Sequence, residues 1–412
     1  MKHWKYAGFL LCALLISSIS ACKKEKARYD FVIYCKVAPG FHASDIGMVV
    51  TDAAGNILKT FVIGSNEFDF QRTLQVDEDI KTCHIHLGVR YDPAGKTFLY
   101  SHLDVQNGAL VVFEPSWFVQ TNAEARQKVV RVSGIESLDS MGFLGGATIY
   151  PYGIFMPEES RAFVSMPFAP NQGGVVHGRA NGEPGYRYLY LPESIMTNVE
   201  WDYETQWSLF QPVPAAKTVA TDASLPPAKE MLVEAITPDF KHFVRIGPGI
   251  HIDPANLQFI QPEGVPEILR IRLNGEDYAT ERIFQPGEPL QFKMTDMQIG
   301  NISSTPGKGF KIETSGDIDM LELICDESNY YTWKIQGRPE SFENATLPAL
   351  SELSKYISMK QAVPTPFWRF TVRAHQFGQH DYPDVRAGFP FRSEELFAVA
   401  RSGYFMLEKR FE

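Results

Sequence analysis

Apolar and polar residues alternate along most of this chain. Between Tyr29 and about Phe118, β-branched and aromatic residues recur at every second position in runs such as 29–37 and 82–91, and turn sequences separate the runs. Each run can place one side of a strand against a core and the other side outward. The spacing is typical of a β-sandwich with immunoglobulin-like or transthyretin-like architecture, which we predict for residues 29–120.

The same pattern returns in the rest of the chain. Residues 121–210 are predicted to form a second β-rich module with longer loops. Residues 211–228 are rich in Pro, Ala and Thr and lack periodicity, which predicts a linker. Residues 229–412 are predicted to form a β-rich C-terminal region, which a stretch rich in Gly, Pro and Ser at 303–309 could divide into two modules.

One segment has helical spacing. Leu347, Leu350, Leu353 and Ile357 lie three or four positions apart, and Thr346 could cap the first turn. The predicted fold class is therefore all-β, made of tandem β-sandwich modules, with one short helix in the C-terminal part.

Composition limits the functional classes. Hydrophobic residues make up 44% of the chain and aromatic residues 13%, enough to fill real cores. The net charge is −10 and no basic block occurs, so nucleic acid and anionic lipid surfaces are poor candidate partners. The sequence has no G-x-S-x-G, H-E-x-x-H or Walker motif, and no G-x-G-x-x-G after a strand. No cofactor is expected, and the enzyme hypothesis is weakened.

The first residues have the order of a secretory signal. Lys2 and Lys5 precede an apolar segment at 6–19, which is short for a membrane span, and small residues follow up to Cys22. Residues 1–21 are therefore predicted to be a cleaved signal peptide. The ending Ile19-Ser20-Ala21-Cys22 resembles the lipobox of bacterial lipoproteins. The alternative is an ordinary signal peptide with a chance cysteine.

The lipobox resemblance implies a cellular location. In such lipoproteins the thiol corresponding to Cys22 carries acyl chains such as palmitate, which anchor the protein in the outer membrane at about 0.8 kcal/mol per buried methylene. Residues 22–28 would then form a lipidated, charged tether. This stretch partly resembles the surface-export signal of Bacteroidota lipoproteins, although it contains only one acid, Glu25. We expect the protein to face the cell exterior, with the periplasmic side as the alternative.

Two cysteines of the first module could face its interior. Cys35 shares its alternation with Phe31 and Ile33, and Cys83 shares its own with Ile85. They could pair, which would stabilise the module by roughly 4 kcal/mol in the chain-entropy model, or remain buried free thiols. Cys325 is expected in the core of the C-terminal region.

Three histidines form a candidate metal site. His84 and His86 lie on one face of a predicted strand, opposite Cys83, and His102 lies on the next strand. Three imidazoles that met could bind a metal ion. The alternative places His84 and His86 on the solvent-facing side of the sheet.

Aromatic residues give a candidate ligand surface. Trp201, Tyr203 and Trp207 share one side of a predicted strand, and Tyr330 lies outside the alternation of Tyr331 and Trp333. Exposed rings could stack on sugar rings; the alternative is that they fill the sandwich core. Asp139-Ser140-Met141 also resembles the O-glycosylation acceptor of exported Bacteroidota proteins, which would make Ser140 a modification site.

Three functional classes follow. The first is a surface-exposed binding or adhesion protein, with a glycan as the leading ligand and possible protein partners in the envelope. The second is a structural or accessory subunit of a fimbrial or envelope complex, which would expose an edge strand or an apolar patch. The third, a hydrolase, would need convergent carboxylates or a His/Asp group; no catalytic residue is assigned.

Overall fold

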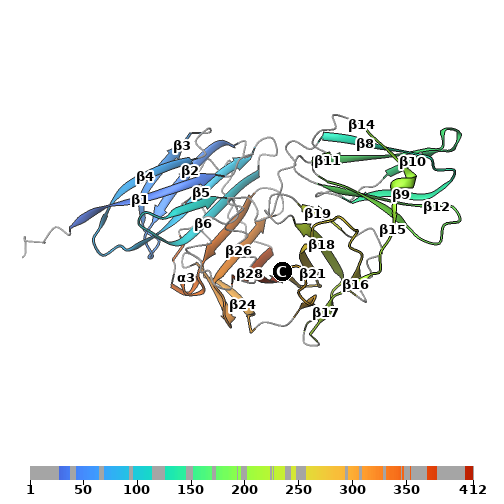
Figure 1. Cartoon of the computed structure of the whole chain (residues 1–412). Coiled ribbons are helices and arrows are strands. Elements are labelled where there is room, and N and C mark those ends of the chain that lie inside the picture. Colours follow the sequence, from blue (N-terminus) through green and yellow to red (C-terminus); the bar gives the residue numbers. More distant parts are fainter. Residues whose placement is uncertain are drawn as a thin grey trace, which may run out of the picture.

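The strands of the chain form several sheets. The structure is a computed structural model. It describes residues 27–37, 43–64, 69–91, 96–113, 126–144, 152–168, 173–192, 194–195, 202–222, 225, 227–236, 243–246, 257–292, 296–305, 309–327, 331–344, 346–347, 353, 369–377 and 404–411. Most of this part is β-strand, with one short α-helix, so the β-rich prediction is confirmed (Figure 1).

The N-terminal module consists of two facing sheets. A three-stranded sheet has the order β4 (Asp69–Asp77), β1 (Arg28–Val37) and β7 (Leu110–Phe113). The second sheet contributes β6 (Lys96–Gln106), β5 (Thr82–Tyr91), β2 (Ala43–Thr51) and β3 (Ile57–Ile63). Alternate residues from both sheets, such as Phe31, Met48, Ile85 and Phe113, share one buried hydrophobic cluster. This layered arrangement is sandwich-like.

The second module pairs two four-stranded sheets. One has the order β10 (Tyr152–Met156), β11 (Arg161–Phe168), β8 (Arg126–Ser133) and β14 (Asp202–Gln206). The other has the order β15 (Gln211–Pro212), β13 (Arg187–Leu191), β12 (Gly174–Ala180) and β9 (Leu138–Leu144). Two 3₁₀ turns, η2 (Pro157–Glu159) and η3 (Trp207–Leu209), follow β10 and β14. Val130, Val164, Val176 and Trp207 belong to its buried cluster.

The C-terminal region supplies the remaining elements. They are β16 (Lys217–Thr218), β17 (Ala220–Thr221), β18 (Glu230–Ile236), β19 (Phe243–Arg245), β20 (Gln258–Phe259), β21 (Ile268–Asn274), β22 (Tyr278–Phe284), β23 (Gln291–Phe292), β24 (Gln298–Thr305), β25 (Gly309–Ser315), β26 (Met320–Glu327), β27 (Tyr331–Gly337), α3 (Pro339–Asn344), β28 (Arg369–Gln376) and β29 (Phe405–Phe411). β16 pairs with β20, β17 with β23, and β24 with β25.

One sheet crosses two of the predicted modules. Its order is β19-β18-β21-β22-β29-β28-β26-β27-β6-β5-β2-β3. The joint lies where β27 pairs in parallel with β6, from Tyr331 opposite Thr97 to Gln336 opposite His102. The N-terminal module therefore shares its main sheet with the C-terminal region, a long-range pairing that no local pattern signals.

Two predicted boundaries contain paired strands. Residues 303–309, a candidate division, lie across the antiparallel β24–β25 hairpin, in which Thr305 is opposite Gly309. Within the predicted linker 211–228, β15 pairs with β13 of the second module, and β16 and β17 pair with β20 and β23. Short stretches of this segment thus take part in sheets.

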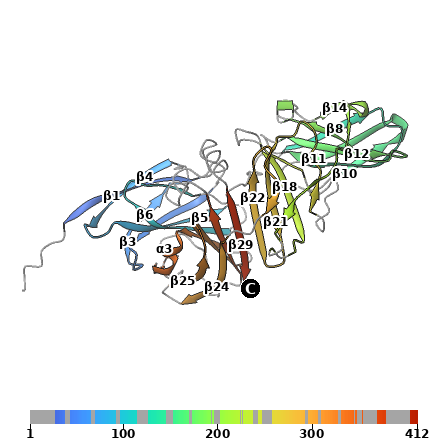
Figure 2. The same cartoon turned by 60° about the horizontal axis from the view of Figure 1, so that its bottom comes forward.

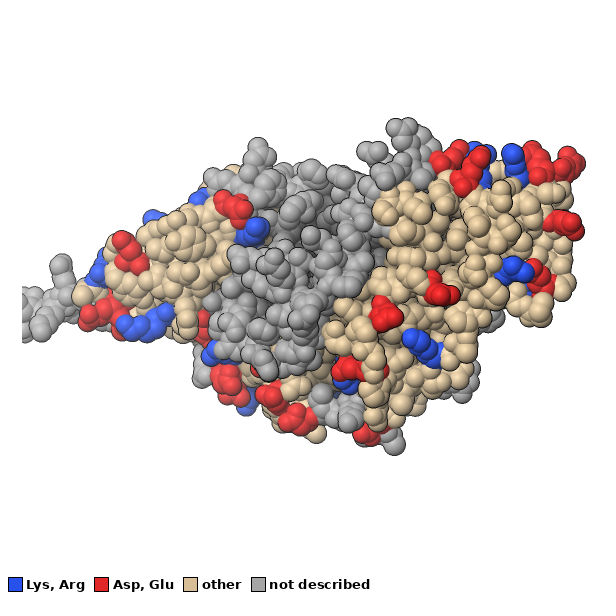
Figure 3. All heavy atoms as spheres, viewed as in Figure 1, with Lys and Arg blue, Asp and Glu red and all other residues tan. Residues whose placement is uncertain are grey.

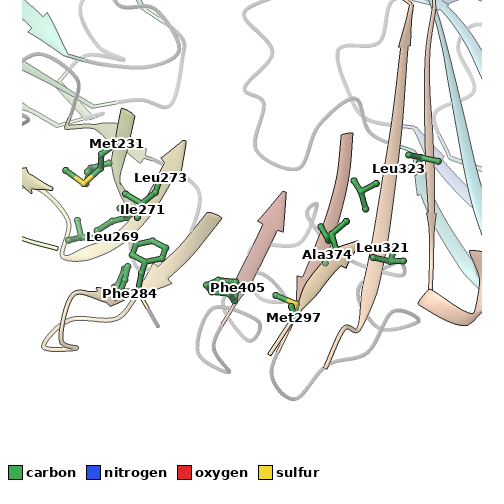
Figure 4. Close-up of a cluster of buried hydrophobic side chains, with 14 of the residues drawn as sticks. Met231, Leu269, Ile271, Leu273, Phe284, Met297, Leu321, Leu323, Ala374 and Phe405 are labelled. Atoms are coloured by element: carbon green, nitrogen blue, oxygen red, sulfur yellow. The ribbon is translucent and has the colours of Figure 1, made fainter. Parts of the chain in front are cut away.

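The largest hydrophobic cluster covers one face of the long sheet. It includes Met231, Ile271, Phe284, Leu323 and Ala374 from five strands, and Figure 4 shows these side chains in two groups with Met297 and Phe405 between them. Cys325 is fully buried in this cluster, as expected. The cluster thus joins both halves of the C-terminal region.

The other face of the same strands carries ion pairs. Glu322 is fully buried on β26 and accepts hydrogen bonds from Arg373 at 2.8 Å and Gln336 at 2.7 Å, while Lys334 lies 2.7 Å from it. Glu408 on β29 is bound by Arg373 at 2.8 Å and by Arg272 at 2.9 Å. These contacts connect β21, β29, β28, β26 and β27, strands that are far apart in the sequence.

The helix α3 (Pro339–Asn344) lies before the predicted helix, which starts at Leu347. Leu353, inside the predicted helix, is helical, whereas Leu347 is not. Residues 348–352 and 354–357 of that prediction lie outside the described residues. Leu347 and Leu353 are both buried in the largest cluster, consistent with inward-facing positions. Among the described residues, no helix has the length and hydropathy needed to span a bilayer.

The second module and the start of β1 lie at opposite ends of the molecule. β1 begins at one end in both views, and β8, β10 and β14 lie at the other (Figures 1 and 2). On the face in Figure 3, acidic and basic side chains are interspersed, and charges of both signs gather along the outer edge of the second module. Arg131 and Asp202, on the adjacent strands β8 and β14 of that module, form an ion pair at 2.8 Å.

Candidate functional site

The predicted aromatic surface is only partly described, and its described members pack inward. Trp207 is 8% exposed and begins η3 rather than continuing the strand. Its ring lies 4.8 Å from that of Phe210, and half-buried Tyr203 packs against the same cluster. Trp201 and Tyr330 lie outside the described residues. The core alternative therefore holds for Trp207, because the strand ends before it and the chain turns into the sandwich.

The three histidines do not form a metal site. His86 is fully buried and bonds to Ser101 through Nδ1 at 2.7 Å and to Thr51 through Nε2 at 3.1 Å. His102 packs edge-on against Phe113 of the N-terminal cluster, with ring centroids 5.0 Å apart. No group of three or more His, Cys, Asp or Glu side chains suited to a metal ion occurs among the described residues.

His84 also lies in the interior instead of on the solvent-facing side. It is 1% exposed, and its Nδ1 accepts a hydrogen bond from the backbone N–H of Asp104 at 3.1 Å. Burial lowers the pKa of His84, which the carboxylate of Asp104 partly counteracts. Both faces of β5 are thus covered. Alternation along β5 distinguishes its two faces but cannot show that a second layer covers each of them.

Cys35 and Cys83 are free thiols in the structure. Both belong to the N-terminal cluster, and Sγ of Cys35 lies 3.9 Å from Sδ of Met48. Burial raises the pKa of each thiol to about 12, with a small opposing effect of Arg72 on Cys35. Of the two alternatives for this pair, the structure has the buried free thiols. Lipidation at Cys22 falls outside the described residues.

A pocket of about 450 Å³ lies at one end of the β12–β13 hairpin in the second module. A volume of this size is within the range of small-molecule sites. The turn between the strands contains Gly182, whose φ of +82° suits glycine. The lining residues are Arg179 of β12, Glu183, Pro184, Gly185 and Tyr186 of the turn, Arg187 of β13, Pro212 of β15, and Val213.

Two stacked guanidinium groups define the pocket walls. The Arg179 guanidinium lies 5.3 Å from the ring centre of Tyr186, and the Arg187 guanidinium lies 5.9 Å from that of Trp207. Nε of Arg179 donates to Asp139 at 2.7 Å, and a second N–H of the same group binds the same carboxylate. This hydrogen bond raises the pKa of Arg179.

The remaining polar contacts fix the hairpin end. Nε of Arg187 donates to Glu183 at 3.1 Å, and Ser140 on β9 donates its hydroxyl hydrogen to the Tyr186 oxygen at 3.3 Å. Ser140, the predicted glycosylation site, is therefore half-buried on a strand beside the pocket. The pocket lining combines two cations, the carboxylate of Glu183 and a phenol ring, and the Arg179 cation is paired with Asp139. These planar groups can donate and accept hydrogen bonds.

Sequence reasoning did not select these residues. The turn Gly182-Glu183-Pro184-Gly185 stands out in the sequence, and an arginine lies on each side of it. The second signal would have been the pairing of β12 with β13, which brings Gly178 opposite Arg187 and therefore both arginines to one end of the sheet.

The comparisons with known proteins identify no family for this chain. No protein-family model matches the chain, and none of the curated proteins matches it. Among solved structures it is similar to the N-terminal four Ig domains of Dscam1 isoform 4.4, with 7% identity, a TM-score of 0.13, and coverage of 85% of this chain and 96% of that one. It is also similar to Escherichia coli alpha-2-macroglobulin activated by porcine elastase, with 10% identity, a TM-score of 0.13, and coverage of 85% and 42%. TM-scores this low assign neither family nor function.

Proposed function

We propose that this protein is an outer-membrane lipoprotein that faces the cell exterior and binds a glycan in the Tyr186 pocket of its second module. The anchor would be acylated Cys22. The fold would be a set of tandem β-sandwich modules of immunoglobulin-like or transthyretin-like type, fused by the shared sheet. The observation that carries the proposal is the pocket itself, with the planar guanidinium group of Arg179 at the tyrosine ring and that of Arg187 at the ring of Trp207.

The pocket chemistry suits a sugar. Sugar hydroxyls both donate and accept hydrogen bonds, and Arg179 and Arg187 supply several N–H donors in a fixed plane, while Asp139 and Glu183 supply acceptors. The side chain of Arg179 is 42% exposed, so its outer edge can be reached by a ligand. The ring of Tyr186 adds an apolar surface with a polar tip.

The placement of the pocket supports the same proposal. β1 follows the tether, and the second module lies at the other end of the molecule (Figure 1). A lipid on Cys22 would hold the N-terminal module near the membrane. The pocket would then be presented away from the bilayer.

A glycan array tests the pocket with a matched pair of variants. Arg179→Ala removes one wall. Arg131→Ala is the control, because Arg131 is also half-exposed, pairs with an aspartate and stacks on an aromatic ring, Phe163, at 5.2 Å, but lies outside the pocket. We expect the wild-type chain and the control to bind the same glycans, and Arg179→Ala to bind them at least tenfold more weakly. No binding by the wild-type chain, or equal binding by both variants, would contradict the proposal.

A second candidate function rests on an edge strand. β3 is the last strand of the twelve-stranded sheet, and its Val62 is 89% exposed. Such an edge can accept a strand from another protein, as an accessory subunit of an envelope complex would. A protein that copurifies at fixed stoichiometry, and is lost when Val62→Lys is introduced, would favour this function over glycan binding.

A further inference from the structure

A second cavity lies in the C-terminal region, away from the Tyr186 pocket. It is a half-open pocket of about 370 Å³ lined by β22, β24 and β29. Its apolar wall is formed by Leu225, Tyr278, Met297, Ile299, Phe405 and Leu407. β22 and β29 are adjacent strands of the long sheet, and they join its two halves within this region.

The wall is part of the protein interior. Met297 is 1% exposed, Ile299 and Phe405 are 7% exposed, and Tyr278 is 8% exposed. Three of them, Met297, Ile299 and Phe405, are members of the largest hydrophobic cluster, and Figure 4 shows Met297 and Phe405 between its two groups of side chains. Protein interiors are normally close-packed, so apolar side chains beside a half-open pocket make fewer contacts than they would around a bound ligand. A ligand that fills the pocket would supply these contacts and displace water from the apolar wall.

One cation is held at this apolar wall. Nζ of Lys409 on β29 donates to the backbone oxygens of Ile299 and Gly300, both at 3.2 Å, and lies 5.1 Å from the ring centre of Phe411. An ammonium group has three donors, and these bonds use two of them. The third can bind an acceptor on a ligand. Two acids also belong to the lining: Asp277 is exposed, and the carboxylate of Glu408 is paired with Arg373 and Arg272.

The volume limits the size of the ligand. An engineered cavity of about 150 Å³ holds benzene, so a cavity of 370 Å³ has room for about fifteen heavy atoms. Apolar walls with one fixed ammonium suit a ligand with an apolar body and a single anionic head. We propose that this cavity binds a medium-chain fatty acid, with the alkyl chain along Met297, Phe405 and Leu407 and the carboxylate at Lys409.

This site has a structural consequence of its own. A ligand that binds only the folded chain stabilises it in proportion to the logarithm of its free concentration. Because the cavity lies where β22 meets β29, the bound chain would fill the junction between the two halves of the cluster. Binding is therefore expected to raise the thermal unfolding temperature, independently of any glycan.

The test uses residues 22–412 carrying Cys22→Ser, without the predicted signal peptide, which keeps every described residue and avoids detergent. Dodecanoate, dodecanol and hexanoate are titrated by calorimetry and by thermal unfolding. We expect saturable binding of dodecanoate with a rise in the unfolding temperature, and at least tenfold weaker binding of hexanoate. Lys409→Gln should weaken dodecanoate binding at least tenfold and leave dodecanol binding unchanged.

Variants that fill the cavity provide a second test of dodecanoate binding. Leu407→Trp places an indole in the void and should abolish dodecanoate binding, whereas Val62→Trp, on the exposed edge strand, should not. If Leu407→Trp fails to fold, Leu225→Trp fills the cavity from the other side. Absence of saturable dodecanoate binding, or equal binding by a folded cavity-filling variant, would overturn the proposal. Equal effects of Lys409→Gln on dodecanoate and dodecanol would overturn the carboxylate assignment.

Discussion

Nε1 of Trp333 donates a hydrogen bond to Oγ of Ser101 at 2.8 Å, although the two residues are 232 positions apart. Trp333 lies on β27 and Ser101 on β6, the two strands that join the C-terminal region to the N-terminal module. The same Oγ of Ser101 lies 2.7 Å from Nδ1 of His86, and Nε2 of His86 lies 3.1 Å from Oγ1 of Thr51, both at hydrogen-bond distance. This chain of hydrogen bonds crosses four adjacent strands.

Replacing the central hydroxyl should weaken that joint. Ser101→Ala leaves buried donors and acceptors on Trp333 and His86 without a partner, which costs about 1–3 kcal/mol of unfolding free energy. Urea unfolding followed by tryptophan fluorescence measures the change. Ser208→Ala, at an exposed position of η3, is the control and should change little. Equal stability of the two variants would show that the hydrogen-bond chain contributes nothing to the joint.

The buried ion pairs predict a larger effect. Glu322→Ala leaves Arg373 and Lys334 without their shared carboxylate inside the protein, and breaking a buried pair typically costs about 3–5 kcal/mol. Glu276→Ala is the matched control, because its pair with Lys229 is exposed on both sides and worth about 0–1 kcal/mol. Both are measured by urea unfolding. A loss at Glu322 no larger than that at Glu276 would contradict the structural role of this network.

Acid should destabilise the fold in two steps. Burial lowers the pKa of His86 to about 3 and that of His375 to about 4, whereas unfolded histidine titrates near 6.5. The unfolded chain therefore binds more protons below pH 6.5, and stability present above that pH is lost as the pH falls. Burial by itself would raise the pKa of Glu408, but Arg373 and Arg272 hold it at about 2, so its contribution is lost between about pH 4.3 and 2.

Urea midpoints between pH 7.5 and 3 measure these two steps. The midpoint should fall between pH 7 and 5, and His375→Gln should reduce the fall in that range while leaving the steeper loss below pH 4.3. A midpoint that stays constant or rises from pH 7 to 5 would exclude the buried neutral histidines.

The three described cysteines should resist alkylation. Cys35, Cys83 and Cys325 are buried, and burial raises the pKa of each thiol, so little thiolate is present or accessible at pH 8. We expect no modification by iodoacetamide in the folded chain and three modified thiols in urea, for the Cys22→Ser chain without its signal, measured by mass. Val62→Cys is the reactive control. One modified thiol in urea without reductant, and three with it, would reveal a Cys35–Cys83 disulfide instead.

Local alternation predicted the strands and much of the core. Phe31, Ile33 and Cys35 are buried as their shared parity requires, and the runs at 29–37 and 82–91 are strands. The parallel pairing of β27 with β6 could not be predicted in this way, because it joins segments more than 200 residues apart. The same long-range packing covers the second face of β5, which is why His84 and His86 are buried rather than exposed.

The candidate site was harder to predict for a different reason. Trp207 shares its parity with Tyr203, but the chain leaves the strand after Gln206, so the ring turns into the core. The Tyr186 pocket depends on the ends of three strands and a turn that meet only in the folded module. Single residues such as Arg179 give no sign of this in the sequence, since an exposed arginine on a strand is ordinary.

Protease shaving of intact cells tests most directly whether the second module is presented outside the cell. Cells that produce the full chain are treated with protease and immunoblotted with an antibody against the second module, and a periplasmic protein serves as the marker of an intact envelope. We expect the module to be degraded while the marker survives. Protection of the module under conditions that digest other surface lipoproteins would place it in the periplasm and contradict the capture of external glycans.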